Sequence, residues 1–467
     1  MKRKVVIIGG GPAGYSCAVR CAQLGLHPIL IEETRLGGVC LHAGCIPTKA
    51  LLKNAQVARL VHSEAANYGV FTDHVRLDYK VGVSRSKKVV STLQSGLTEL
   101  LKYHNVEIIT ARASVVAPGL LSLSHPDGTQ TTIKAENIVI ATGASPSMPA
   151  KWDLDRRVIF DFRGALALEE LPSSMIIIGA GAIGMEFATL FHSYGVDITI
   201  IEREAVLLPS EDRAISTEIE RRYRNKGITT YVGTEVQDVL IKDKMALITF
   251  QQQGSPHTHT LESETILVAT GFRAQLGNTI TTSLPLKIDK LGWISIDNRM
   301  QTSIEGIWAI GDVTGKSMLA HSGYLMGRVC AESIAKVPTQ TNIDYTMIPR
   351  AVFTDPNIAS FGYTETQLQA RNIPYKKGLA HFKHNGKAIA FNQTEGWILI
   401  LADERYGEVL GLHAIGADVA ELLGEVTLAQ GLEATVDELI NNIHLHPSYS
   451  EALWEAVAQI REVSLHS

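Results

Sequence analysis

Two stretches decide the fold of this chain: VVIIGGGPAG at residues 5–14 and MIIIGAGAIG at residues 175–184. Each begins with a short apolar run of the kind found in a parallel strand that is covered on both faces. Each continues with Gly-x-Gly-x-x-Gly, whose glycines permit a tight turn, close approach to a pyrophosphate and close packing of the next helix on the strand. Both stretches therefore predict the start of a dinucleotide-binding βαβ unit.

The residues that follow complete both units. In the first unit we expect a strand over 5–8, a helix that ends near Gly25 and a second strand over 28–31. The second unit repeats this order with strands over 175–178 and 198–201. Two full matches in one chain make it unlikely that both glycine turns are only structural, which is the alternative interpretation.

Each second strand ends in an acid, Glu32 or Glu202, which is placed to accept hydrogen bonds from a ribose 2′-hydroxyl. Such an acid repels the 2′-phosphate of NADP, so Glu202 favours NAD, although Arg203 directly after it weakens that preference. Two such units suit an enzyme that holds FAD permanently in one half and binds NAD(P)H in the other. A hydride could then pass from nicotinamide to flavin.

The composition describes a globular protein of several domains. A chain of 467 residues exceeds one ordinary core, and its 45% apolar and 19% charged residues exclude a disordered chain. The net charge of -5 gives no electrostatic argument for nucleic acid or an anionic membrane as a partner. No apolar run is long enough to span a bilayer, and the basic start leads into a strand rather than a signal peptide. We expect a cytoplasmic protein or the mature form of an organellar one.

The run GGVCLHAGCIPTK at 37–49 places Cys40 and Cys45 five positions apart. On a helix they would lie within about 8 Å along the axis, and a distorted first turn, eased by Gly44, could bring them to bonding distance. A disulfide that closes so short a loop gains little from loop entropy, so a structural purpose is hard to defend. Zinc is an alternative, but it needs three or four ligands and only His42 lies nearby. We therefore favour a reducible disulfide.

The same run resembles the redox motif of the class I pyridine nucleotide–disulfide oxidoreductases, and the resemblance covers essentially the whole chain. It implies an α/β fold with two Rossmann-like dinucleotide-binding domains and an α+β C-terminal dimerisation domain. In that family the first cysteine, here Cys40, exchanges with substrate, and the second, here Cys45, contacts the flavin. Lys49 would lie near the reactive face of the flavin and Glu186 would pair with it. Taken alone, Glu186 reads as a solvated helix carboxylate.

The resemblance also divides the chain into domains. It implies an FAD-binding domain over 1–146, an NAD-binding domain over 147–271, a second FAD-binding or central part over 272–345 and an interface domain over 346–467. The crossings between the nucleotide domains would be Ala141-Thr142-Gly143 and Ala269-Thr270-Gly271, each at the end of an apolar strand.

Further matches assign residues to the two cofactors. Gly311-Asp312 resembles a second FAD fingerprint in which the aspartate bonds the ribityl chain, although alone Asp312 could be a turn residue. The residues expected at FAD are Gly9, Gly11, Pro12, Ala13, Gly14, Glu32, Gly38, Lys49, Ala113, Thr142, Gly143, Asp312, Met318, Leu319, Ala320 and His321. Those expected at NAD are Gly179, Gly181, Ile183, Gly184, Glu186, Glu202, Val236 and Gly271. No metal site is expected.

The run HLHPSYSE at 444–451 resembles the acid/base motif of the family. There the histidine before the proline, here His446, takes a proton from the substrate thiol, and Glu451 would orient it and raise its basicity. A histidine pKa near 6.5 suits this exchange. Ser448 and Glu451 also fit a capping box of the following helix, which alone would explain Glu451. His444 competes for the catalytic role but lacks the following proline.

Among family members, dihydrolipoamide dehydrogenase fits best. Glu202 argues against glutathione reductase, and the chain ends without the cysteine pair of mercuric reductase and large thioredoxin reductase. Soluble transhydrogenase needs no redox disulfide. In the family the histidine acts on the disulfide of the other subunit, which implies an obligate homodimer.

We therefore expect oxidation of a dihydrolipoyl dithiol, small or borne on a lipoyl protein, through Cys40–Cys45 and FAD to NAD⁺. One alternative is an NAD(P)H-dependent reductase of another disulfide or a persulfide. Another is a non-catalytic flavin-bearing component of a lipoyl-protein assembly.

Four departures from the family pattern indicate a divergent member. An arginine stands one place late within 272–278, and 322–328 lacks the usual acid before its second glycine. Ser448 replaces a frequent threonine, and His42 replaces the common asparagine. His42 adds a titratable group between the two cysteines.

Overall fold

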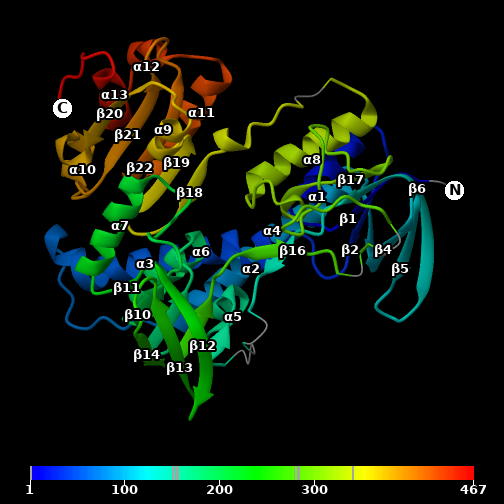
Figure 1. Cartoon of the computed structure of the whole chain (residues 1–467), viewed down its shortest axis with the longest axis horizontal. Helices are drawn as coiled ribbons and strands as arrows, with labels where there is room; N and C mark the ends of the chain where they lie inside the picture. The colour runs from blue at the N-terminus through cyan, green and yellow to red at the C-terminus, as the bar shows by residue number, and fades with distance from the viewer. Residues whose placement is uncertain are drawn as a thin grey trace.

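Three large sheets, of seven, five and five strands, organise the chain into three lobes (Figure 1). The structure is a computed structural model, and it describes residues 3–149, 152, 157–277, 279–280, 284–338 and 341–466. It confirms the predicted α/β class and the two doubly wound units.

The first sheet has the order β3-β2-β1-β6-β5-β4, and β17 also pairs with β6. Strands β1, β2, β3 and β17 run parallel to the carboxyl half of β6, whereas β4 and β5 form an antiparallel extension. The strands are β1 (Arg3–Ile8), β2 (Ile29–Glu32), β3 (Glu107–Thr110), β4 (Arg112–Ala117), β5 (Leu120–Ser124), β6 (Gln130–Ile140) and β17 (Ile307–Ala309). Because β17 follows β6 by more than 160 positions, two distant segments build this lobe.

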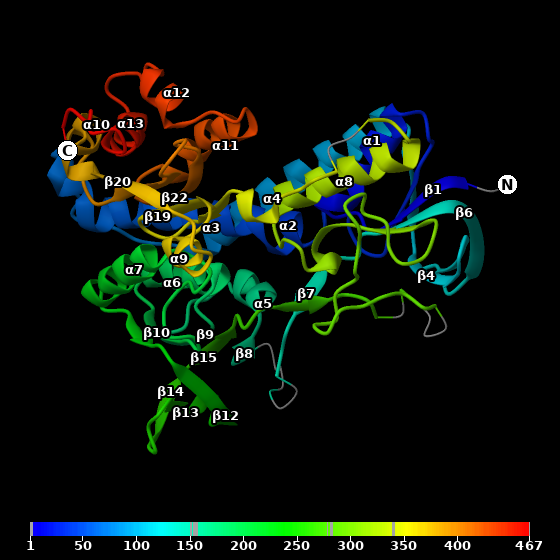
Figure 2. The same ribbon diagram turned by 45° about the horizontal axis from the view of Figure 1, so that its top comes forward.

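The helices of this lobe are α1 (Pro12–Gln23), α2 (Gly38–Ala43), α3 (Cys45–Arg59), α4 (Tyr79–Tyr103) and α8 (Ala320–Ala335), with short turns η1 (Leu60–Glu64), η2 (Ala65–Tyr68) and η3 (Gly311–Thr314). Helix α8 packs closely on α1, since a Cβ on Gly327 would lie 2.6 Å from the carbonyl oxygen of Ala13. Figure 2 shows α3 passing between the other two lobes.

The second sheet is wholly parallel, in the order β11-β10-β9-β15-β8. Its strands are β8 (Ile159–Phe160), β9 (Ser174–Ile178), β10 (Asp197–Ile201), β11 (Thr229–Tyr231) and β15 (Thr265–Val268), and its helices are α5 (Phe162–Ala167), α6 (Ala182–His192) and α7 (Arg213–Asn225). An antiparallel sheet projects from it, made of β12 (Thr234–Lys242), β13 (Met245–Gln252) and β14 (Thr258–Ser263). The paired strands β7 (Ala144–Pro146) and β16 (Phe272–Ala274) connect this lobe to the first.

The C-terminal lobe is an antiparallel sheet in the order β18-β19-β22-β21-β20. Its strands are β18 (Arg350–Val352), β19 (Asn357–Gly362), β20 (Tyr375–His381), β21 (Trp397–Asp403) and β22 (Val409–Gly416). Its helices are α9 (Glu365–Ala370), α10 (Gly386–Ala390), α11 (Leu423–Gly431), α12 (Val436–Asn441) and α13 (Ser450–Gln459), with turns η4 (Tyr345–Met347), η5 (Phe382–His384) and η6 (Val419–Leu422). Helix α13 lies against β20, since a Cβ on Gly378 would lie 1.8 Å from the carbonyl oxygen of Ala456.

The elements expected from the sequence lie within two residues of where the structure has them. The first helix ends at Gln23 rather than at Gly25, and Gly25 follows in the left-handed region with φ of 73°. Glycine adopts that conformation without steric cost, so it ends the helix.

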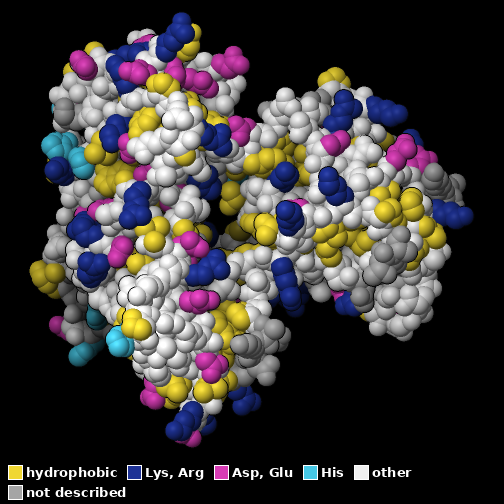
Figure 3. All heavy atoms as spheres, in the orientation of Figure 1, with side chains coloured by type: hydrophobic (Ala, Val, Ile, Leu, Met, Phe, Trp, Pro, Cys, Tyr) yellow, Lys and Arg dark blue, Asp and Glu magenta, His cyan; other side chains and the backbone are white. Residues whose placement is uncertain are grey.

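The surface carries both signs of charge. On the face drawn in Figure 3, Lys and Arg side chains alternate with Asp and Glu side chains over all three lobes. Within the described ranges, no helix combines the length and apolar character needed to cross a membrane.

Candidate active site

The first glycine turn joins β1 to α1 at the carboxyl edge of the first sheet. Gly9 has φ of 105°, and a Cβ there would lie 2.3 Å from the carbonyl oxygen of Ala141. A Cβ on Gly14 would lie 1.9 Å from the carbonyl oxygen of Gly9. Helix α1 has no side-chain cap at its N-terminus, so its first N–H groups can meet an anion.

The second glycine turn, between β9 and α6, has the same geometry. Gly179 has φ of 103°, and a Cβ on Gly184 would lie 2.0 Å from the carbonyl oxygen of Gly179. Gly181 and Gly11 share φ of -72° and ψ of -178°. The two turns are therefore copies in backbone conformation as well as in sequence.

The acids at the second strands occupy equivalent positions. Glu32 accepts from Gly10 N at 2.7 Å and from Thr34 N at 2.8 Å. Glu202 accepts from Ala180 N at 2.6 Å and from Glu204 N at 2.8 Å. Each carboxylate thus lies at the mouth of its glycine turn.

Arg203, the residue that weakened the preference for NAD, is bound to the neighbouring acid Glu204. Its guanidinium pairs with Glu204 at 3.2 Å and is largely exposed. The buried carboxylate beside the second turn is therefore Glu202.

The surroundings of the two turns differ. Gly37 N donates to the carbonyl oxygen of Gly10 at 2.8 Å, and a Cβ on Gly38 would lie 2.7 Å from the Cα of Gly11. On the other side, a Cβ on Gly323 of α8 would lie 3.3 Å from Ala13. Around Gly181, a Cβ would meet no described atom within 4 Å. The first turn is therefore covered by the chain and the second is open.

Two polar groups near the first turn fit a ligand rich in hydroxyl groups. Thr142 follows β6, and its buried Oγ1 has no hydrogen-bond partner among the described residues. Asp312 follows the adjacent strand β17, and burial raises the pKa of its carboxyl to about 6. Both lie at the carboxyl ends of parallel strands, where α/β folds bind nucleotides. These residues and the glycine cradle fit FAD.

The other residues expected at the cofactors are spread over several elements of the two lobes. At the first lobe, Met318 and Leu319 lead into α8, His321 Nε2 lies 2.8 Å from the carbonyl oxygen of Pro349, and Ala113 is buried in β4. Gly143 and Gly271 have φ of 74° and 104° at the ends of β6 and β15. At the second lobe, Ile183 lies in α6 and Val236 in β12. Asn278 of the divergent segment lies outside the described residues.

The two redox cysteines lie on either side of a helix break. Helix α2 ends at Ala43, Gly44 has φ of -133° and ψ of -114°, and α3 begins at Cys45. Both cysteines are free thiols. Interaction with the Cys40 side chain, together with the charge of Lys49, lowers the pKa of Cys45 to about 7, and the same interaction raises the pKa of Cys40. In the dithiol form Cys45 is therefore the thiolate and Cys40 the thiol.

Lys49 lies one turn after Cys45 and joins α3 to α6. Its Nζ donates to both carboxylate oxygens of Glu186 at 2.8 Å, and it lies 4.8 Å from the ring centroid of Phe353. The backbone N of Phe353 donates to Glu186 Oε1 at 3.0 Å. Glu186 is buried, so it is not the solvated helix carboxylate of the alternative interpretation.

Of the two ring nitrogens of His42, which lies between the cysteines, only one has a hydrogen-bond partner among the described residues. Its Nε2 lies 2.7 Å from the carbonyl oxygen of Leu36, and its buried Nδ1 has no hydrogen-bond partner among the described residues. This contact ties the end of α2 to the loop that covers the first glycine turn.

His446 and Glu451 lie together in the C-terminal lobe. The Nδ1–H of His446 donates to Glu451 Oε1 at 2.8 Å, and the backbone N of Ser448 donates to Glu451 Oε2 at 2.7 Å. The pKa of Glu451 is lowered: burial acts to raise it, but these hydrogen bonds outweigh that effect. Of the capping box, only the bond from Ser448 N to the Glu451 carboxylate is present, because α13 has Tyr449 as its N-cap and no side-chain cap. The capping box is therefore not the whole explanation of Glu451, whose other oxygen binds the imidazole.

The loop that carries His446 is fixed from inside. His444 Nε2–H donates to Glu425 Oε1 at 2.8 Å, and Asn442 Nδ2 donates to the same oxygen at 3.0 Å. The alternate residues Ile443 and Leu445 point outward and are 94% and 77% exposed. His444 is thus an anchor of this loop, which leaves the exposed His446 as the candidate base.

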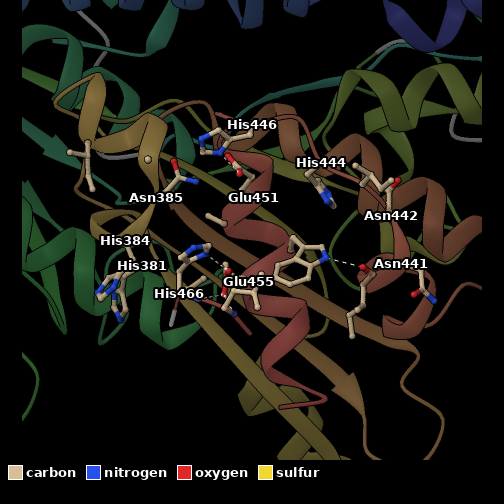
Figure 4. A pocket seen from close by; sticks show the side chains of 18 residues that line it. His381, His384, Asn385, Asn441, Asn442, His444, His446, Glu451, Glu455 and His466 are labelled. Atoms are coloured by element: carbon tan, nitrogen blue, oxygen red, sulfur yellow. Dashed lines mark hydrogen bonds and ion pairs between the residues drawn. The ribbon is translucent and has the colours of Figure 1, made fainter. Parts of the chain in front are cut away.

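Within one protomer, the predicted catalytic residues form two separate groups. Cys40, Cys45, Lys49 and Glu186 lie where α2, α3 and α6 meet. His446 and Glu451 line a cavity whose lining includes neither cysteine (Figure 4). Sequence reasoning missed Phe353, whose backbone donor has no sequence signature, and Glu425, which lies far from the histidine motif. In the described ranges, no group of three or more His, Cys, Asp or Glu residues could hold a metal ion.

Comparison with known proteins gives the family. Residues 3–327 match the family model of the pyridine nucleotide-disulphide oxidoreductases, and residues 348–457 match that of their dimerisation domain. The chain is 37% identical over 454 residues to a dihydrolipoyl dehydrogenase of Corynebacterium glutamicum, covering 97% of this chain and 96% of the relative. It is 38% identical over 453 residues to the dihydrolipoyl dehydrogenase of Mycobacterium tuberculosis, with the same coverage.

A solved structure agrees with these relatives. The Cu(II) complex of the HOCl-induced flavoprotein disulfide reductase RclA from Escherichia coli superposes with a TM-score of 0.86 at 26% identity, covering 98% of this chain and 99% of that one. The dimerisation domain makes the chain a homodimer. This chain belongs to the pyridine nucleotide–disulphide oxidoreductase family, as an NAD-dependent disulfide oxidoreductase whose cofactors are FAD and NAD.

Proposed function

We propose that this protein oxidises the dithiol form of a lipoyl group, free or carried on a protein, through Cys40 and Cys45, and delivers the electrons to NAD⁺. The observation that carries the proposal is the asymmetry of the two thiols, since the pKa of Cys45 is lowered to about 7 and that of Cys40 is raised. FAD, held at the first glycine turn with Asp312 and Thr142, would accept two electrons and return them as a hydride. The relatives are named as dihydrolipoyl dehydrogenases.

Cys40 is the sulfur that the substrate thiolate attacks in this scheme. Attack there releases Cys45 as the leaving group, and a thiol of lower pKa leaves faster. Lys49 stabilises the departing thiolate, and Glu186 with the backbone N–H of Phe353 holds Lys49 in place. Cys45 is then the electron donor and Cys40 the sulfur that remains joined to substrate.

His446 takes the proton of the attacking thiol. Glu451 accepts from its Nδ1–H, which fixes the tautomer with a free Nε2 and stabilises the imidazolium that forms. Because the two groups of residues lie apart in one protomer, we propose that His446 serves the cysteine pair of the partner subunit. We also infer a cytoplasmic location, on composition alone.

Steady-state assays test the substrate. We expect turnover of dihydrolipoamide and of a dihydrolipoyl protein with NAD⁺, and little turnover of glutathione disulfide with NADH or NADPH. Turnover of glutathione disulfide without any turnover of lipoamide would contradict the proposal.

Two substitutions test the roles of the residues. Cys45→Ser should abolish dithiol oxidation while the purified protein keeps its flavin colour. His446→Gln should reduce dithiol oxidation by about 100-fold or more, the usual effect of a positioned base, and should spare NADH oxidation by ferricyanide. Equal loss of both activities in His446→Gln would remove that residue from the thiol half of the reaction.

A further inference from the structure

A second histidine–carboxylate pair lines the cavity that contains His446. The cavity measures about 560 Å³ and is walled by β20, α10, α12 and α13. Besides His446 and Glu451, its lining includes His466 and Glu455. Figure 4 shows the two carboxylates on successive turns of α13, each beside an imidazole that reaches into the same hollow.

The two pairs have the same geometry. His446 Nδ1–H donates to Glu451 Oε1 at 2.8 Å, and His466 Nδ1–H donates to Glu455 Oε1 at 2.8 Å. Residues four apart on a helix lie on one face, so the carboxylates are neighbours. The imidazole side chains are 78% and 70% exposed, and no described residue bonds to either Nε2. Each pair therefore presents an open basic nitrogen to the cavity.

Backbone N–H groups hold the carboxylate of the second pair, as they do in the first pair. Leu465 N and His466 N donate to Glu455 Oε2 at 3.1 Å and 3.2 Å. In the first pair, the backbone N of Ser448 donates to Glu451 Oε2. Each carboxylate thus uses one oxygen to hold the chain and the other to orient an imidazole.

Oxidation of a dithiol releases two protons, and the site has to accept both. In the first step a substrate thiolate attacks Cys40, the Cys40–Cys45 bond breaks, Cys45 leaves as thiolate, and His446 holds the proton. In the second step the other substrate thiol must lose its proton before it attacks the first substrate sulfur. The substrate–Cys40 bond then breaks, and Cys40 leaves with the electron pair and takes the proton from His446. During this step His446 acts as the acid for Cys40, and a second base in the same cavity would take the proton of the second thiol without waiting for His446 to be regenerated.

We propose that His466, oriented by Glu455, is that second base and takes the proton of the second thiol; this inference rests on the dithiol substrate of the proposed function. The net change is two thiols oxidised to one disulfide and one protein disulfide reduced to a thiol and a thiolate. The two protons end on Cys40 and on His466.

A single-turnover experiment separates the two bases. Oxidised holoenzyme is mixed anaerobically with dihydrolipoamide and quenched in acid at increasing times, and the substrate adduct on Cys40 is measured by mass spectrometry. His466→Asn keeps a donor for Glu455 but has no basic nitrogen. We expect it to form the adduct at the wild-type rate and to resolve it about 100-fold more slowly, the lower range for a positioned base.

Three further variants complete the design. His446→Asn should slow adduct formation, and Glu455→Gln, which still accepts from the backbone, should slow resolution less than His466→Asn does. His257→Asn, an exposed histidine between β13 and β14, should change neither phase.

The outcomes are distinguishable. Wild-type resolution in His466→Asn and Glu455→Gln would overturn the second base while leaving the proposed function intact. Loss of dimerisation or of flavin in both variants would also overturn it, because the role would then be structural. A wild-type protein that forms no adduct at all would refute the proposed function itself.

Discussion

The glycine turns of the two dinucleotide-binding units have the same backbone geometry, but the chain around each turn is arranged differently. Their first glycines have φ of 105° and 103°, and both acids accept a backbone N–H from the turn, at 2.7 Å and 2.6 Å. Around the first turn the chain closes, with Gly38 against Gly11 and Gly323 against Ala13. Around Gly181 there is open space.

This difference indicates how the same glycine turn can suit either a permanently bound cofactor or one that exchanges. Close packing of neighbouring segments around the first turn would slow the release of a group bound there, whereas the open second turn leaves room for a ligand to exchange. The first unit is therefore suited to a resident flavin and the second to a nicotinamide cofactor that binds and departs in each cycle.

Substituting the third glycine of each turn should give the largest effects. In Gly14→Ala and Gly184→Ala the new Cβ would lie 1.9 Å and 2.0 Å from a backbone carbonyl oxygen, which cannot move aside. We expect each to cost on the order of 3 kcal/mol of unfolding free energy. Gly14→Ala should also lose flavin, and Gly184→Ala should keep flavin but fail to use NADH, as measured by denaturant melts and absorbance.

Gly96→Ala is the matched control, because a Cβ at that position of α4 meets nothing within 4 Å. It should be neutral or slightly stabilising. Flavin loss from Gly184→Ala alone would reverse the assignment of the two units.

The acid of the open unit should set the nucleotide preference. Glu202→Gln keeps an acceptor for Ala180 N but removes the charge that repels a 2′-phosphate. We expect the ratio of kcat/KM for NADH over NADPH to fall by about 10- to 100-fold, as for one charged hydrogen bond. Glu32→Gln should leave that ratio unchanged, and an equal change in both variants would erase the distinction between the units.

Replacing Lys49, which connects α3 to Glu186 of the second unit, should have the smallest effect. Lys49 favours the thiolate of Cys45, so Lys49→Met should raise the pKa of Cys45 from about 7 by about one unit. The pH midpoint of iodoacetamide alkylation of the reduced protein reports this shift. Lys53→Met, one turn further along α3, should leave the midpoint unchanged. A lower midpoint in Lys49→Met would have the wrong sign.

The same pKa gives the reduced protein a defined dependence on pH. Because folding lowers the pKa of Cys45, its thiolate stabilises the fold above the ordinary thiol pKa near 9. This stabilisation is lost as the pH falls through about 7. Lys49→Met should reduce the contribution.

The sequence allowed the glycine turns to be predicted because backbone sterics leave glycine as the only residue that fits at Gly9 and Gly14. Gly44 and the cysteine spacing predicted a distorted helical turn, and the structure has a full break there, between α2 and α3. The domain limits near 146, 271 and 345 remain predictions.

Other features depend on contacts between distant segments and have no local signature. The cover of Gly11 by Gly38 requires the loop before α2 to fold back, and the Phe353 donor is a backbone group. The Ser448-x-x-Glu451 pattern also fitted a helix cap, and only the structure shows that the carboxylate accepts from both Ser448 N and the imidazole. His466 belongs to no recognisable sequence motif, and only the contacts of residues 465–466 with Glu455 in the structure draw attention to it.

The anchored loop at 442–446 has a consequence for assembly. Glu425 holds Asn442 and His444, so Ile443 and Leu445 are exposed on a backbone that these contacts already fix within one subunit. A partner that covered these two side chains would lose little conformational entropy of this loop, and most of the apolar gain would remain as affinity. If His446 serves the cysteine pair of the partner subunit, as proposed, specific activity follows mass action and falls on dilution below the dissociation constant of the dimer.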